Sequence, residues 1–166
     1  MPTPSSVSAA CRAVARVFDS LVPIAPLLTR IVLGQAFFQT GLGKWRNFDH
    51  TTTFFDSLGL PFPQANAAFI ATLELVGGCL LVLGLGTRVV AALLSCTMVV
   101  AILTADRGDF LAALAHDGDK GLTDVVPLVF LMLLLWLVAH GAGSISVDRY
   151  VCRKRATADP SGAARG

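Results

Sequence analysis

The feature that most constrains this chain is an acid inside an apolar run long enough to cross a bilayer. Residues 67–88 read AAFIATLELVGGCLLVLGLGTR, and Glu74 stands near the middle of the apolar part. A helix of about 20 apolar residues spans a hydrocarbon core about 30 Å thick. A carboxylate at the centre of such a helix is costly unless it is paired, hydrated or protonated. Glu74 is therefore expected to have a partner, a function, or both.

The composition places the whole chain in the membrane class. Of its 166 residues, 54% are hydrophobic and 14% are charged, whereas soluble domains carry about 25% charged residues. The net charge of +2 and the scattered basic residues argue against nucleic-acid binding. The sequence has four cysteines and no C-x-x-C motif: Cys11, Cys79, Cys96 and Cys152. They are therefore expected to be packing residues or bystanders, and not a disulfide framework or a thiol-exchange centre.

The apolar segments predict four spans, at about residues 21–43, 64–85, 88–104 and 122–139. The second and third spans are joined only by the short GLGTR turn, so they must run antiparallel and side by side. The predicted fold is all-α: an integral membrane four-helix bundle, antiparallel, within a membrane domain of residues 21–150. Residues 1–20 are expected to be a disordered tail and an interfacial helix, and residues 151–166 a basic disordered tail.

The distribution of basic residues predicts the orientation. Eight lysines and arginines flank the spans on the side of the termini and the GLGTR turn, against four on the other side. Because basic residues are enriched in cytoplasmic segments, both termini are expected in the cytoplasm.

Polar residues in the spans predict a seam running from the membrane centre to the outer face. Arg30 and Glu74 are each about ten residues from the start of their span, so at 1.5 Å per residue both fall near the midplane, where we expect them to pair. Lys44 and Asp124 lie at the outer ends of the first and fourth spans, and Gln35 lies between the centre and that end.

Two interpretations of this seam remain open. In the first, Arg30 and Glu74 form a structural ion pair that fixes which helices pack together. In the second, the seam lines a pocket for a quinone, a small anion or a lipid headgroup. Glu74 is then the catalytic acceptor or proton carrier, and the substrate-binding residues are Arg30, Gln35, Lys44 and Asp124.

Glycines within the spans are expected to let helices approach closely. Gly34 and Gly41 share a helical face with Arg30, and Gly77 and Gly78 follow Glu74 by less than one and a half turns. No metal site is predicted, since the three histidines, His50, His116 and His140, fall in connectors or at the end of a span.

The chain resembles the DoxX family of small four-helix membrane proteins over about residues 24–150. The residues that carry the resemblance are Arg30, Gly34, Phe38, Gly41 and Lys44, the block LELVGGCLLVLGLGTR around Glu74, and GAGSISVD after the fourth span. The family is related to the DoxD subunit of thiosulfate:quinone oxidoreductase. The resemblance implies a multi-pass protein of the bacterial plasma (inner) membrane with a redox-associated function, and supplies no settled catalytic residue.

The function expected from sequence is a component of a membrane redox system with a quinone or sulfur-compound site in the bundle. If the chain is an enzyme, it is expected to be an oxidoreductase subunit of the quinone-reducing type. The alternatives are a non-enzymatic anchor or assembly subunit for a larger complex, and a small-solute or lipid transporter. The expected partners are membrane lipids, a quinone, proteins of a redox complex and a second copy of the chain.

Overall fold

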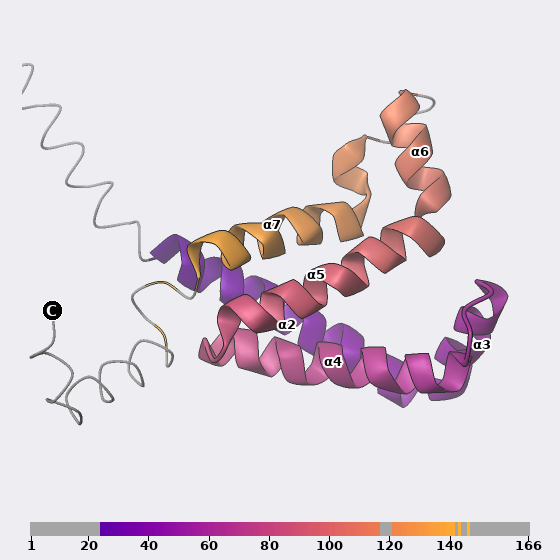
Figure 1. The fold of residues 1–166 in the computed structure, drawn as a ribbon, viewed down its shortest axis with the longest axis horizontal. Helices are drawn as coiled ribbons and strands as arrows, with labels where there is room; N and C mark the ends of the chain where they lie inside the picture. The colour runs from indigo at the N-terminus through magenta and orange to yellow at the C-terminus, as the bar shows by residue number, and fades with distance from the viewer. Residues whose placement is uncertain (1–23, 117–120, 142, 144–145, 147–166) are drawn as a thin grey trace, which may run out of the picture.

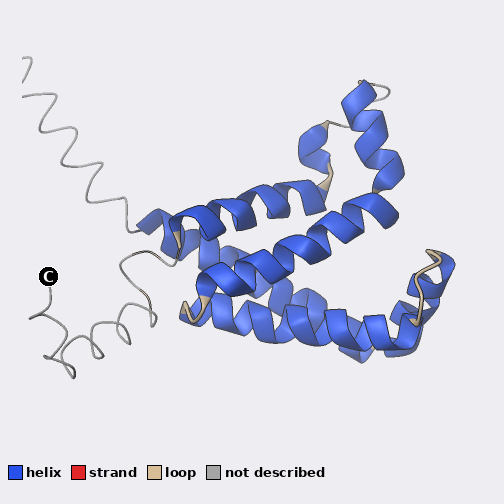
Figure 2. Cartoon of the chain, in the orientation of Figure 1, coloured by secondary structure: helices blue, strands red, loops and turns tan. Residues whose placement is uncertain are grey.

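The computed structural model describes residues 24–116, 121–141, 143 and 146, and its regular elements are all helices (Figure 2). The all-α prediction is therefore confirmed for this part of the chain. The interfacial helix and the basic tail predicted at the two ends lie outside the described residues. The helices are α2 (Ile24–Arg46), α3 (Phe48–Ser57), α4 (Pro63–Leu83), α5 (Thr87–Thr104), α6 (Arg107–Ala115), the short 3-10 helix η1 (Leu122–Asp124) and α7 (Val126–His140).

Two of these helices are long and apolar enough to cross a membrane. They are α4, with 21 residues, and α5, with 18, and their bounds lie within two residues of the spans predicted from sequence. Helix α2 is longer, with 23 residues, but it carries more polar side chains. Helix α7 is strongly apolar and has only 15 residues.

The fourth predicted span begins later than expected. The sequence predicts one helix from residue 122 to 139, whereas the chain forms η1 and leaves helical geometry at Val125 (φ −81°, ψ 87°) before α7 starts. The cause is Pro127, because in a continuous helix a proline cannot donate a hydrogen bond to the carbonyl four residues back, here that of Thr123, and its ring clashes with that carbonyl. A proline fits best in a first helical turn, and α7 starts at Val126. The Asp124 carboxylate caps the start of the short helix by accepting a 2.8 Å hydrogen bond from the Gly121 amide.

The connectors on either side of the α4–α5 pair contain helices that the sequence analysis did not predict. Helix α3 buries Thr51 and Phe55, which are four residues apart and share one face. Helix α6 is shorter and buries Ala113 alone. Both segments mix charges with apolar residues, and their helical periodicity extends over only two or three turns.

Glycine contacts hold α2 against α4 in a fixed antiparallel register. A Cβ atom added to Gly78 would lie 2.6 Å from the Gly34 carbonyl oxygen, and one added to Gly41 would lie 2.8 Å from the Ala71 carbonyl oxygen. Gly34 thus lies opposite Gly78, and Gly41, seven residues later on α2, lies opposite Ala71, seven residues earlier on α4. The two backbones are in contact here, an approach that only residues without a bulky side chain permit.

Gly77, which directly precedes Gly78, faces a different helix. A Cβ atom at Gly77 would lie 3.3 Å from the Leu94 side chain on α5. The double glycine therefore lets α4 approach α2 on one side and α5 on the other.

The turn between α4 and α5 is tied to the end of α7. Gly84 and Gly86 both have positive φ, 71° and 56°, a conformation that glycine adopts without steric strain. Just beyond them, Arg88 Nη2 donates a 3.3 Å hydrogen bond to the Ala139 carbonyl oxygen, one of the last carbonyls of α7. A cation at the carbonyl end of a helix is stabilising.

The helices form two pairs, α2 with α4 and α5 with α7, that meet near the α4–α5 turn. Figure 1 shows the pairs spreading apart from this turn towards the end that carries α3 and α6. The core lies where the pairs meet and consists of Leu33, Phe37, Leu81, Val90, Ala91, Leu94, Met98, Leu134 and Leu137.

Replacing Gly78 with alanine should destabilise the fold, because its Cβ atom would collide with the backbone of α2. We expect a loss of about 1–3 kcal/mol, the usual range for overpacking, seen as a lower melting temperature in detergent by circular dichroism. The matched control is Gly43→Ala on α2, where an added Cβ atom meets nothing within 4 Å. Equal melting temperatures for the two variants would contradict the proposed close contact.

Candidate functional site

Glu74 is buried and forms an ion pair with Lys44. The Lys44 Nζ atom donates a hydrogen bond to Glu74 Oε2, across the contact between α2 and α4. The Glu74 side chain is 4% exposed and that of Lys44 is 26% exposed. The acid in the apolar run therefore has a counter-ion, which offsets the cost of placing its charge among apolar groups.

The antiparallel register explains why these two residues meet. It places Glu74 opposite Phe38, six residues or about 9 Å along α2 from Lys44. Side chains of a helix lean towards its N-terminus. Because the helices run in opposite directions, Lys44 and Glu74 lean towards each other and close this gap.

The predicted pair between Arg30 and Glu74 is wrong. Arg30 is 1% exposed, and its guanidinium packs against Gly84, which a Cβ atom at that position would strike. Gly84 is ten residues beyond Glu74, about 15 Å along α4. Depth counted from the expected start of each span puts Arg30 level with Glu74, whereas the glycine register determines which residues lie opposite each other.

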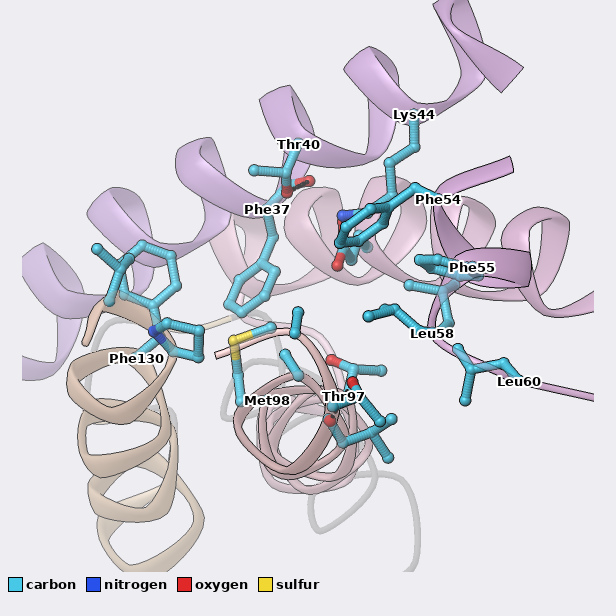
Figure 3. A pocket seen from close by; sticks show the side chains of 18 residues that line it. Phe37, Thr40, Lys44, Phe54, Phe55, Leu58, Leu60, Thr97, Met98 and Phe130 are labelled. Carbon is cyan, nitrogen blue, oxygen red and sulfur yellow. Dashed lines mark hydrogen bonds and ion pairs between the residues drawn. The ribbon is translucent and has the colours of Figure 1, made fainter. Parts of the chain in front are cut away.

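A cavity of about 270 Å³ lies beside the ion pair, where the two helix pairs spread apart. Figure 3 shows Phe37, Thr40 and Lys44 reaching it from α2, Phe54 and Phe55 from α3, Leu58 from just after α3, Thr97 and Met98 from α5, and Phe130 from α7. Glu74 and Ile70 complete the lining from α4. The volume is close to the lower end of the range for small-molecule sites, about 300 Å³.

The polar groups of this cavity are few. Its lining hydroxyls belong to Thr40, Thr97 and Thr104, and each donates its hydrogen to a carbonyl oxygen of its own helix, at 2.7–3.0 Å. They can therefore only accept further hydrogen bonds. Lys44 and Glu74 are the charged residues of the lining.

Aromatic side chains form much of the remaining wall. Phe37 and Phe130 meet edge to face, with ring centroids 5.5 Å apart and planes inclined by 62°. Phe54 and Phe55 lie on the α3 side, with centroids 6.1 Å apart. Such walls favour a flat or apolar guest and leave the Lys44–Glu74 pair to orient it.

Besides Arg30, two more residues predicted to bind substrate lie away from the cavity. Gln35 is exposed and does not line the cavity, because it precedes Phe37 by two residues and so points to nearly the opposite side of α2. Asp124 is exposed, bonds to Gly121 and is also outside the lining. Of the five predicted residues, Glu74 and Lys44 are the two that the structure brings together at the cavity.

The aromatic walls were not predicted from the sequence, although part of the signal is present there. Phe37, Thr40 and Lys44 are spaced by three and four residues, which puts them on one face of α2. The contributions of α3 and α7 depend on how the helices pack and have no comparable local signature. Within the described residues, no group of three or more His, Cys, Asp or Glu side chains could hold a metal ion.

These features define the class: a small helical membrane protein with a charged pair beside an apolar cavity. Residues 25–107 match the DoxX family model, and the chain belongs to this family. The DoxX resemblance seen in the sequence is thus confirmed.

Three bacterial proteins are similar to this chain, two over most of its length and one over about half of it. A Mycobacterium tuberculosis protein named "Uncharacterized membrane protein Rv3486" is 35% identical over 82% of this chain and 86% of its own length. The Escherichia coli "Inner membrane protein YphA" is 29% identical over 80% of this chain and 94% of its own length. The Bacillus subtilis "Putative oxidoreductase CatD" is 43% identical over 49% of this chain, and the chain spans 59% of that relative. No solved structure matches significantly.

Breaking the ion pair should destabilise the protein more than removing a neighbouring surface charge. Lys44→Met leaves Glu74 buried without its counter-ion, and we expect a loss of about 3 kcal/mol, the low end of the range for breaking a buried pair, because Lys44 is partly exposed. The control is Arg46→Met at the same end of α2, where the side chain is exposed.

The double variant Lys44→Met with Glu74→Leu should recover most of the lost stability, because both charges are removed together. Thermal unfolding in one detergent measures all of these variants. A Lys44→Met melting temperature equal to that of Arg46→Met would contradict the structural role of the pair.

Proposed function

We propose that this DoxX-family protein is a quinone-binding component of a membrane redox system. The observation that carries the proposal is the Lys44–Glu74 pair on the wall of an aromatic cavity. A quinone ring is flat and apolar, and its carbonyl oxygens accept hydrogen bonds. The cavity offers aromatic walls for the ring and an ammonium donor for one carbonyl.

The two charged residues have separate roles in this proposal. Lys44 hydrogen-bonds to a quinone oxygen and favours negative charge there as the ring is reduced. Glu74, in hydrogen-bond contact with Lys44, accepts or supplies the proton that accompanies reduction. A quinone bound here supplies two-electron carrier chemistry, and the electrons come from a redox partner in the same membrane.

The proposed membrane arrangement has four spans, α2, α4, α5 and α7, with both termini and the α4–α5 turn in the cytoplasm. The bias of basic residues towards the termini and the turn supports this orientation. The cavity then lies in the outer half of the bilayer, near α3. The Escherichia coli relative, named an inner membrane protein, supports the same compartment.

A quinone suits the site better than a sulfur anion does. Lys44 and Glu74 carry opposite charges, so the pair offers no net positive charge to an anion. An anion next to the pair would also lie close to the Glu74 carboxylate. The word oxidoreductase in the name of the Bacillus subtilis relative is consistent with a redox role.

The test of this function is binding of a naphthoquinone to the protein in lipid nanodiscs. Removing the ammonium donor in the Lys44→Met, Glu74→Leu double variant should weaken binding about tenfold or more, since a hydrogen bond to a charged group contributes about 1.5–3 kcal/mol. The double variant is used because we expect it to fold without a buried unpaired charge.

Gln35→Ala is the matched control for binding. Gln35 is polar and on the same helix but lies outside the cavity lining, so its loss should leave the affinity unchanged. Absence of binding by the wild-type protein, or equal affinity of the double variant and Gln35→Ala, would reject the proposed site.

A further inference from the structure

Two exposed valines line the cavity, one on α5 and one on α7, and the space between them is called the opening below. Val100 on α5 and Val126 on α7 both line the cavity, and they are 41% and 56% exposed. Each side chain therefore faces the cavity on one side and the surroundings of the protein on the other. A molecule that is bound in the cavity and extends between these two valines would contact apolar side chains on its way out.

The two valines lie at the same level along the helix pair. Arg88 of α5 contacts Ala139 of α7 at the end near the α4–α5 turn. Val100 is twelve residues further along α5, and Val126 is thirteen residues back along α7. Val100 is therefore about 18 Å and Val126 about 20 Å from that contact, at 1.5 Å per residue.

This depth places the opening opposite lipid tails. The hydrocarbon core is about 30 Å thick, so a position about 18 Å from the inner end of the helices is still within it. The first charged residues beyond α5 are Asp106 and Arg107, six or more residues past Val100. On the α7 side, Asp124 lies two residues before Val126, so the opening is in the outer part of the hydrocarbon core.

The charges inside the cavity restrict what can occupy it. Lys44 and Glu74 already neutralise each other, so an anionic guest would have the Glu74 carboxylate beside it and a cationic guest the Lys44 ammonium. In a cavity otherwise lined by apolar groups and three acceptor hydroxyls, either unpaired charge is unfavourable. The site favours a neutral guest.

We infer that the ligand is a neutral ring carrying an apolar tail, with the ring in the cavity beside Lys44 and Glu74 and the tail passing between Val100 and Val126 into the lipid. This inference rests on the proposed function and adds the class of ligand and its route. The ligand is exchanged sideways with the bilayer, and water-soluble anions are excluded.

The experiment compares two neutral benzoquinone probes, one with a decyl tail and one without a tail, in lipid nanodiscs containing the full chain. Val100→Trp places a large side chain in the opening. It should weaken binding of the tailed probe about tenfold, a change of about 1.4 kcal/mol, and leave the tail-less probe unchanged. Val126→Trp should do the same from α7, so the test does not depend on the folding of one variant.

The matched control is Val99→Trp. Val99 is the neighbouring residue on α5 and is 40% exposed, but it does not line the cavity. The Val99→Trp variant should bind both probes as strongly as the wild type does. Two results would overturn the route through the opening. One is that Val100→Trp and Val126→Trp weaken binding of both probes equally. The other is that these two variants bind the tailed probe as strongly as Val99→Trp does.

A second measurement locates the tail and tests the charge restriction. A photoreactive group at the end of the tail should label segments of α5 and α7 next to Val100 and Val126, and labelling of α3 alone would overturn the inference. Naphthoquinone should displace the tailed probe and naphthoquinone sulfonate should not. Displacement by both would overturn the restriction to neutral ligands, whereas a wild type that binds no probe would reject the proposed function itself.

Discussion

The contact between the backbones of α2 and α4 is the constraint on which the site depends. Gly34 and Gly78 touch, and the register they impose decides which side chains meet across the two helices. Lys44 reaches Glu74 only because the helices are antiparallel and their side chains lean towards each other. A shift of one helical turn, about 5.4 Å, would leave the buried acid without its counter-ion.

The local content of the fold could be predicted from sequence to a large extent. The apolar lengths of α4 and α5 and the glycine-rich turn between them gave bounds within two residues. The break before α7 was missed because an apolar run begins directly after Asp124 and the hydrogen bond that Pro127 cannot donate was not weighed. Helix α3 was missed because a short amphipathic helix and a charged aromatic connector have similar composition.

The candidate site was predictable only in part, for a different physical reason. That Glu74 needs a counter-ion follows from the cost of burying its charge. Which cation supplies it follows from helix register, which depends on contacts between segments far apart in the chain. Arg30 and Lys44 are both basic residues of α2, and depth counting alone selected the wrong one. The cavity itself results from the spreading of two helix pairs, a property that no single segment encodes.

The double-sided packing of α4 restricts changes in its length far more than changes in its residues. Glu74 and Gly78 are four residues apart, so both face α2, while Gly77 faces α5. Inserting or deleting one residue between Glu74 and Gly78 would rotate one relative to the other by about 100°. The acid and the glycine could then no longer face α2 together. The number of residues between Glu74 and Gly84 is fixed in the same way, because Glu74 must reach Lys44 and Gly84 must contact Arg30 on the same helix, α2.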